Sequence, residues 1–199
     1  SDLGTIRLNC RINGIRRLED GRLELSGFTG EAFNRVLFTG SPQQLAEMET
    51  PLPRDFRQSL SELKSKGNIC MVLELERSLS PYYWTTVVQK NLPFVLIIEH
   101  TNLVGMDGYN GHIVYLSRYA DRHDDIFMKS DEEIESIFLS GLFKVFPEFR
   151  REWVKRAVVS RALYAQPVIT KNYSRLIPPL KTPADGLYLA SMAQVYPED

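Results

Sequence analysis

Short apolar and polar runs alternate through the first forty residues, with turn residues between them. In the run that begins at Arg11, Ile12 and Leu18 fall on one side of a two-residue alternation, which is typical of a half-buried strand. Asp20-Gly21 favours a tight hairpin turn, because glycine tolerates the positive backbone angles that such a turn needs. The pattern predicts strands over residues 5–8, 11–18, 22–26 and 33–39.

Ser41-Pro42 is a typical helix start, and after it the apolar residues recur at steps of three and four residues. Two helices are predicted, interrupted at Pro51 and Pro53, with the second ending near Gly67-Asn68. An apolar strand over 69–75 is expected to follow.

The remaining sequence alternates between apolar runs and breakers. Ser130 and Glu133 form a capping box before an amphipathic helix that Pro147 ends. The prolines after residue 166 keep the chain extended up to about residue 185. Further strands are predicted over 92–98, 112–119, 153–165 and 187–190, with a loop over 102–111. This order indicates an α+β fold with a mostly antiparallel mixed sheet.

Composition restricts the classes of function. The 24 basic and 25 acidic residues give a net charge of −1, which provides no patch for nucleic acid, and no apolar run is long enough to span a membrane. Cys10 and Cys70 are far apart and next to apolar or strand-like residues, which favours reduced, buried thiols and a cytoplasmic protein; one disulfide between them is the alternative. Composition leaves the oligomeric state open.

Motifs for several common chemistries are missing from the sequence. The glycines form no phosphate-binding loop, and Gly105 to Gly111 lacks the required spacing. The histidines lie in separate settings without metal-ligand spacing, and no nucleophile elbow is present. The sequence therefore predicts no metal site and identifies no catalytic residue.

Three blocks carry a family resemblance: I-R-L-N-C-R-I from Ile6, F-N-R-V-L-F-T-G-S-P-Q-Q-L from Phe33, and T-P-A-D-G-L-Y-L-A from Thr182. Together they resemble the flavin-containing amine oxidase and protoporphyrinogen oxidase superfamily. The resemblance implies a β-meander of the FAD domain over 1–40, a substrate-binding domain over 41–165, and a proline-rich return with an FAD-domain strand over 166–199. The first four strands and the last one are then expected to share one sheet.

The same resemblance implies that the chain is an internal segment of a longer flavoenzyme. A glycine-rich Rossmann unit would precede Ser1 and a pyrophosphate-binding helix would follow Asp199, so this segment alone should bind FAD weakly or not at all.

The resemblance also assigns cofactor positions. Leu187 to Ala190 would form the strand beneath FAD, and Ser191 would replace a family glycine that permits close backbone approach. Gln194, Tyr196 and Asp199 would lie near the flavin or its ribityl chain.

Two polar segments are candidates for a substrate pocket. His100 and Asn102 follow a strongly apolar strand, where a neutral imidazole could orient substrate or shuttle a proton; solvated strand-end residues are the alternative. Tyr164 and Gln166 end a long strand before the proline-rich return, which passes near the flavin ring in the resembling family, although simple packing also explains them.

The combined interpretation is the substrate-binding portion of an FAD-dependent oxidoreductase that moves a hydride from substrate to flavin. Its small-molecule substrate would be apolar or amine-bearing. The alternative is a non-enzymatic α+β module that binds a ligand or a protein, with Tyr82 to Trp84 as its contact surface.

Overall fold

The computed structural model describes residues 4–27 and 31–196 and confirms the α+β class. Contacts divide the chain into a flanking unit, Ser1–Lys64 with Pro167–Asp199, and a middle unit, Ser65–Gln166. The segment 41–64 packs with the terminal segments by this division, because apolar side chains of its two helices lie in the core of the flanking unit.

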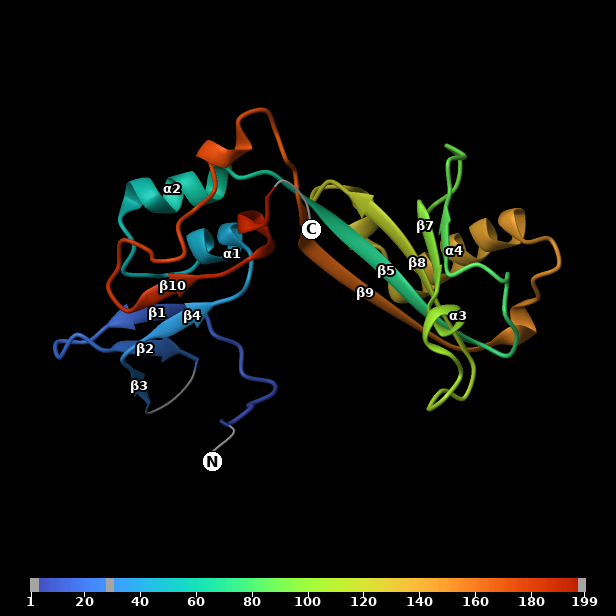
Figure 1. The fold of residues 1–199 in the computed structure, drawn as a ribbon, viewed down its shortest axis with the longest axis horizontal. Coiled ribbons are helices and arrows are strands. Elements are labelled where there is room, and N and C mark those ends of the chain that lie inside the picture. Colours follow the sequence, from blue (N-terminus) through green and yellow to red (C-terminus); the bar gives the residue numbers. More distant parts are fainter. Residues whose placement is uncertain (1–3, 28–30, 197–199) are drawn as a thin grey trace. The chain divides into compact units, whose positions relative to one another are not determined.

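Each unit has its own set of helices and strands (Figure 1). In the flanking unit these are β1 (Gly14–Arg17), β2 (Leu23–Ser26), β3 (Ala32–Phe33), β4 (Val36–Phe38), α1 (Pro42–Glu47), α2 (Arg54–Glu62) and β10 (Leu187–Leu189), with 3-10 turns at Tyr173–Arg175 and Met192–Gln194. In the middle unit they are β5 (Ser65–Leu75), β6 (Trp84–Thr86), β7 (Leu96–Glu99), α3 (His100–Val104), β8 (His112–Ala120), α4 (Asp131–Val145) and β9 (Val154–Pro167), with 3-10 turns at Asp125–Met128 and Arg151–Trp153.

The N-terminal hairpin forms as predicted, but it begins later. β1 pairs with β2 in antiparallel register, and Gly21 has φ +85° in the turn between them. The strand predicted over 5–8 is wrong: this stretch has no regular structure, and Ile6 is 89% exposed. Asn9 has φ +58°, which breaks an extended chain at that point.

The last strand returns to the N-terminal part of the chain, but not into one common sheet. β10 pairs with β4 in parallel, with Leu189 opposite Phe38, while β1, β2 and β3 form a separate antiparallel sheet. The prediction of a single sheet from the first four strands and the last one is therefore wrong. The pairing of the final strand with an N-terminal strand is present.

The two helices of the flanking unit begin as their sequence indicates. Ser41 caps α1 through a capping box with Gln44, and Pro42 occupies the first turn. α2 ends at Glu62, so the predicted helix end at Gly67-Asn68 is wrong. The core of this unit consists of buried apolar side chains from the strands, the helices and the proline-rich return, among them Ile15, Leu23, Leu45, Leu60, Leu187 and Leu189.

The middle unit is a five-stranded sheet in the order β6-β7-β8-β5-β9. β5 begins at Ser65, so Gly67 lies inside the strand, where neighbouring groups approach its backbone closely. A side chain at Gly67 would approach the Phe127 ring to 2.5 Å and the carbonyl oxygen of Ala162 to 2.9 Å. The loop predicted over 102–111 is wrong in its first part, because α3 extends to Val104.

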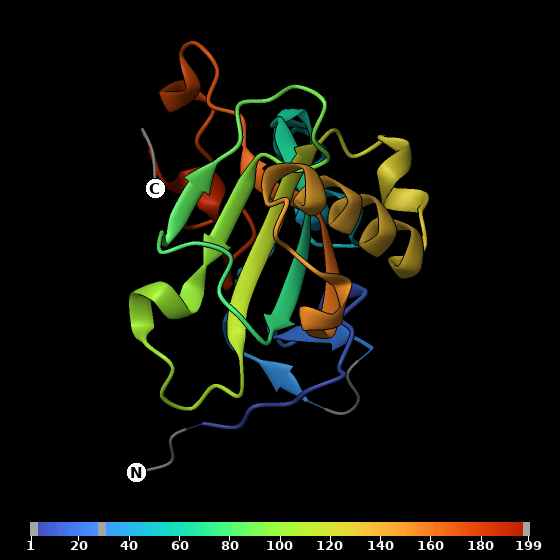
Figure 2. The ribbon, with the colours of Figure 1, turned by 90° about the vertical axis from the view of Figure 1, so that its right-hand side faces the viewer.

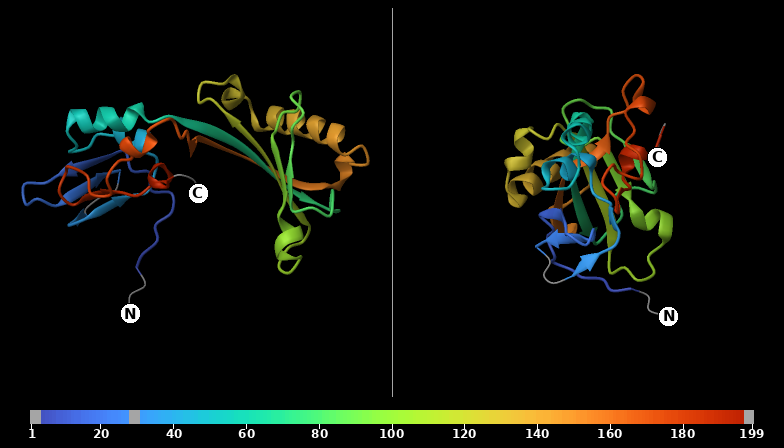
Figure 3. Two further views of the ribbon diagram at one scale, coloured as in Figure 1. Left: turned by 45° about the horizontal axis from the view of Figure 1, so that its top comes forward. Right: turned by 90° about the vertical axis from the view of Figure 1, so that its left-hand side faces the viewer.

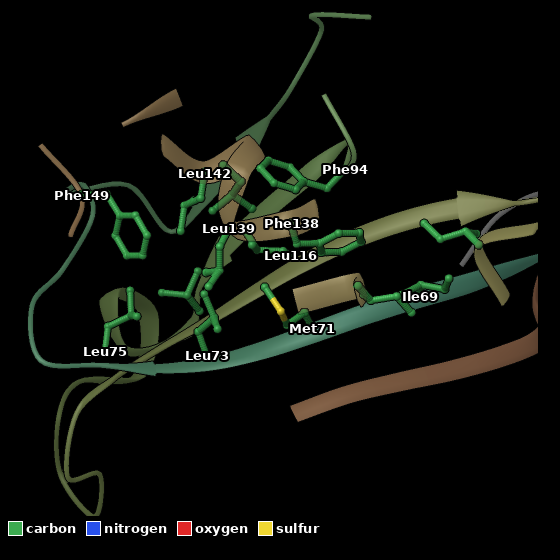
Figure 4. Packing of buried hydrophobic residues seen from close by; sticks show 14 of the residues in the cluster. Ile69, Met71, Leu73, Leu75, Phe94, Leu116, Phe138, Leu139, Leu142 and Phe149 are labelled. Atoms are coloured by element: carbon green, nitrogen blue, oxygen red, sulfur yellow. The ribbon is translucent and has the colours of Figure 1, made fainter. Parts of the chain in front are cut away.

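α4 lies along one face of this sheet (Figures 2 and 3), and its Ser130 capping box is confirmed. Alternate residues of β5 point toward it, and Ile69, Met71, Leu73 and Leu75 are all fully buried. Figure 4 shows these side chains packed with Leu116 of β8 and with Phe138, Leu139 and Leu142 of α4. The opposite face of the sheet carries the alternate, less buried positions.

Candidate functional site

His100 is the predicted substrate residue with the most developed surroundings. It begins α3 directly after β7, and its ring lies edge-on to the rings of Tyr109 and Tyr115, with centroids 5.7 Å and 5.9 Å away. Its Nε2 is 2.9 Å from the hydroxyl of Tyr109. The contact places an imidazole and a phenol within hydrogen-bond distance at the end of the sheet.

Glu99, just before His100, carries a carboxylate that is almost completely buried. The residue is 1% exposed, and its two oxygens accept hydrogen bonds from Ser78 Oγ at 2.7 Å, Leu79 N at 3.0 Å and Ser80 Oγ at 2.8 Å. Burying a carboxylate costs free energy unless hydrogen bonds replace its water contacts. Glu99 therefore fixes the segment 78–80 to the end of β7.

Asn102 stabilises the turn before β6 through its side-chain amide. Its Nδ2 donates to the carbonyl oxygens of Ser80 at 2.8 Å and Tyr82 at 3.1 Å. Both donors of the amide are thus committed to the backbone of the same turn that Glu99 holds. Asn102 follows His100 by two positions in α3, so the two side chains do not lie on the same side of the helix, and the hydrogen bonds of Asn102 hold the turn that leads into β6.

Tyr164 and Gln166 lie at the other end of the sheet. Arg122 Nη1 donates to the hydroxyl of Tyr164, and the guanidinium carbon is 5.6 Å from the centre of its ring. β9 passes Gly67 near residues 162–163, whereas Tyr115, beside His100, is opposite Val72. At 3.3 Å per residue, these positions on β5 are on the order of 15 Å apart, so the structure does not bring the four predicted residues together.

The sheet face that points away from α4 connects these two ends. Tyr115 is opposite both Val72 of β5 and Ile98 of β7, and all three are half-buried. Cys70 is on the same face, and burial raises the pKa of its thiol. The face is thus mainly aromatic and aliphatic. Its members on the three central strands are Asn68, Cys70, Val72, Glu74, Leu96, Ile98, Ile113, Tyr115, Ser117 and Tyr119.

The flanking unit contains the predicted cofactor residues at the carboxyl ends of its parallel strand pair. Ala190 N donates to the carbonyl oxygen of Phe38 at 2.9 Å, which extends the β4–β10 pairing by one residue. The hydroxyl of Ser191 is buried and faces Gln194 N in a capping box, but its own proton has no acceptor in the part of the chain that the structure describes. Ligands of α/β folds bind at the carboxyl ends of parallel strands, so Ser191 has a suitable location and an unused donor for a cofactor.

Gln194 and Tyr196 are committed to internal contacts. Gln194 Oε1 accepts from Ser191 N at 2.8 Å, and its Nε2 donates to the carbonyl oxygens of Leu189 and Pro178. Tyr196 stacks on Tyr173 with ring centroids 6.0 Å apart. Gln194 therefore supports Ser191 and the end of β10, while Asp199 lies outside the described residues.

A hollow of about 550 Å³ opens beside the end of β4 in the same unit. Phe38 and Gly40 line it, together with Arg11 and Asn13 from the segment before β1 and Gln44 from α1. The residues that could hold part of a cofactor are therefore those around the ends of β4 and β10. Within residues 4–27 and 31–196, no three His, Cys, Asp or Glu side chains gather as a metal site requires, and no helix has the length and apolarity to span a bilayer.

Sequence reasoning missed Glu99, Tyr109 and Tyr115. The sequence does contain a signal for the burial of Glu99: the residue follows directly on an apolar run, and the end of a buried strand can itself be buried. Tyr109 is an aromatic residue within a glycine-rich loop, which is also visible in the sequence. The contact of both tyrosines with His100 depends on the pairing of β7 with β8, which local sequence does not specify.

The model of the flavin containing amine oxidoreductase family matches residues 1–198. The chain belongs to this family. The resemblance deduced from the three sequence blocks is thereby confirmed.

Solved structures share the fold of this amine oxidoreductase family member. A protein of Exiguobacterium sp. 255-15 that is assigned as a protoporphyrinogen oxidase is 21% identical with a TM-score of 0.64, and the match covers 92% of this chain and 41% of that one. Reduced UDP-galactopyranose mutase is 11% identical with a TM-score of 0.66, covering 87% and 38%. A putrescine oxidase variant redesigned in cofactor binding is 14% identical with a TM-score of 0.63, covering 92% and 42%.

The chain thus spans about two fifths of the length of these structures. A search of curated proteins found no significant match.

Proposed function

We propose that this family member is part of an FAD-dependent oxidoreductase, in which the flanking unit contributes to the FAD site and the middle unit binds the substrate. The observation that carries the cofactor assignment is the buried hydroxyl of Ser191 at the carboxyl end of the β4–β10 pair, whose proton has no acceptor among the residues that the structure describes. A polar atom in this state is costly unless a ligand satisfies it.

The residues of this chain would have different roles at the cofactor. Ala190 and Ser191 would contact FAD, with the backbone near Gly40 beside them, while Gln194 holds Ser191 N in place. Bound FAD would supply the hydride acceptor for oxidation of a C–N or C–C bond. The parallel strand ends provide only part of a dinucleotide site, so this segment alone would retain FAD weakly.

The face of the middle unit that points away from α4 would take the substrate. Tyr115, Val72 and Ile98 offer an apolar surface, and Glu74 supplies a carboxylate on the same face. This combination supports an apolar or amine-bearing small molecule, because aromatic rings and a carboxylate both favour an organic cation. His100 at the end of the face would orient the substrate or move a proton.

The free thiols of Cys10 and Cys70 support placement of the protein in the reducing cytoplasm. The exposed side chains of Tyr82 and Trp84 favour the second candidate function, a non-enzymatic module with a protein contact surface.

The test of the flavin assignment uses the full-length protein. We expect a yellow protein that releases FAD on denaturation. Ser191→Ala should bind FAD several-fold more weakly because the hydroxyl is lost, and Ser191→Val should lose it because a branched side chain fills the space. Ser174→Val, at an exposed position of the same unit, should bind FAD normally. A folded protein that remains colourless after reconstitution would overturn the flavin assignment.

The test of the substrate assignment follows bleaching of the flavin absorbance under anaerobic conditions. Putrescine, benzylamine and protoporphyrinogen are suitable first compounds, since relatives named for amine and porphyrin substrates share the fold. Substituting Tyr115→Ala should raise KM at least tenfold for a compound that reacts. An unchanged KM would exclude this face of the sheet as the substrate site.

A further inference from the structure

Tyr109 occupies one ring nitrogen of His100 from the surface of the middle unit. Tyr109 is 38% exposed, yet its hydroxyl lies 2.9 Å from His100 Nε2. Tyr115 also packs against this ring, with the two ring planes nearly perpendicular. The only hydrogen bond of the imidazole among the described residues is therefore the one to Tyr109, a residue that stands at the surface.

The loop that carries Tyr109 is attached at its ends and hinged by glycines. Gly105 N donates to Thr101 O at 3.0 Å, and Lys155 Nζ donates to Asn110 O at 2.6 Å. Gly105, at the first attachment, and Gly108, inside the loop, have φ +84° and +83°, and nothing lies within 4 Å of the position that a Cβ atom would take at either residue. Both glycines can change conformation without steric conflict, so Tyr109 can move while the loop ends stay fixed.

We propose that Tyr109 is a gate residue: its hydroxyl donates to His100 Nε2, and a ligand reaches that nitrogen only after Tyr109 has moved away. The phenol is placed as the donor because a neutral imidazole nitrogen is a better acceptor than a phenol oxygen. A ligand that replaces Tyr109 must make the same interaction. It therefore carries one hydroxyl or amine donor on an apolar body, which lies against Tyr115 and its neighbour Ile98.

This inference rests on the proposed substrate role of the middle unit, but its test uses neither flavin nor catalysis. A failure of the gate and a failure of the flavoenzyme assignment are thus separate results.

The experiment measures acylation of each histidine by diethyl pyrocarbonate, which reacts with a free imidazole lone pair, with peptide masses as the readout. In the full chain, His100 should react slowly. Tyr109→Phe should accelerate its reaction at least fivefold, because the ring remains and only the hydroxyl is lost. His123, whose Nε2 accepts from Arg122 Nε at 3.1 Å, should react at an unchanged rate.

Tyr82→Phe is the matched control, since Tyr82 is an exposed tyrosine of the same unit and no hydrogen bond involves its hydroxyl in the described structure. It should leave the rate at His100 unchanged. An unchanged rate at His100 in folded Tyr109→Phe, verified by circular dichroism, would overturn the gate.

The class of ligand is tested in Tyr109→Phe with two aromatic probes that differ by one donor. Millimolar 4-methylphenol should protect His100 from acylation, whereas 4-methylanisole should not. Protection by both probes, or by neither, would overturn the assignment of a donor-bearing ligand.

Discussion

Leu189 of β10 lies opposite Phe38 of β4 in a parallel pair, although the two residues come from opposite ends of the chain. Leu189 is fully buried and packs in the same core as Leu23 and Leu45. The pair thus joins the proline-rich return to the N-terminal strands and fixes the position of Ser191. The stability of the flanking unit and the candidate cofactor site depend on the same contact.

Truncation of Leu189 to alanine should destabilise the flanking unit by about 2–5 kcal/mol, because the change leaves a cavity in a closed core. Leu37→Ala on β4 is the matched control: Leu37 is 57% exposed, and its loss should change the free energy of unfolding by less than about 0.5 kcal/mol. Urea denaturation of both variants provides the measurement. Equal effects would show that β10 does not hold the core.

Glu99→Gln should destabilise the middle unit by about 1–3 kcal/mol. The amide group of glutamine brings its own donors toward Ser78 Oγ, Leu79 N and Ser80 Oγ, which are themselves donors to the carboxylate. Glu76→Gln, at an exposed position, serves as the control. The measurement is urea unfolding followed by Trp84 fluorescence in a Trp153→Phe background; the prediction fails if both variants unfold at the same urea concentration.

Elements with strong local sequence signals are predicted correctly, whereas elements whose conformation depends on tertiary contacts are not. The helix after Ser130 and the turn at Gly21 were both correct, because capping and positive backbone angles are local properties. The strand over 5–8 was wrong because its residues alternate like a strand but pair with no strand among the residues that the structure describes. Gly67 suggested a helix end, whereas the close approach of Ala162 explains the glycine within a strand.

The candidate site was predicted only in part for a related reason. His100 was recognisable as a titratable residue at a strand end, but its partner Tyr109 depends on the path of a loop. Asn102 is also predicted to line the pocket, and its amide donates to the backbone carbonyl oxygens of Ser80 and Tyr82. Residue type and position along a strand indicate where polar groups gather, but not which of them remain available to a ligand.

Cys70 should be much less reactive than Cys10 toward iodoacetamide. Burial raises the pKa of the Cys70 thiol, so less thiolate is present at neutral pH, whereas Cys10 is exposed. The raised pKa means that the unfolded chain releases this proton at a lower pH than the folded chain, so alkaline pH favours unfolding. Peptide mass analysis after timed alkylation should show Cys10 modified first and Cys70 more slowly, with the difference lost in urea. Equal rates for the two thiols without denaturant would contradict the partial burial of Cys70.

Gly141→Ala in α4 sets helix propensity against packing. Alanine is favoured over glycine within a helix by about 1 kcal/mol. A side chain at Gly141, however, would approach Pro93 Cδ to 2.5 Å and Phe94 Cε1 to 3.0 Å, and such overpacking typically costs about 1–3 kcal/mol. We expect a net loss of stability, because Pro93 and Phe94 lead into β7 and the buried Phe94 has little room to shift.

Ser140→Ala, at the exposed neighbouring position, should leave stability unchanged or raise it slightly. Thermal unfolding of the two variants measures the difference, and a stabilised Gly141→Ala would show that the contact between α4 and the segment before β7 is looser than this packing requires.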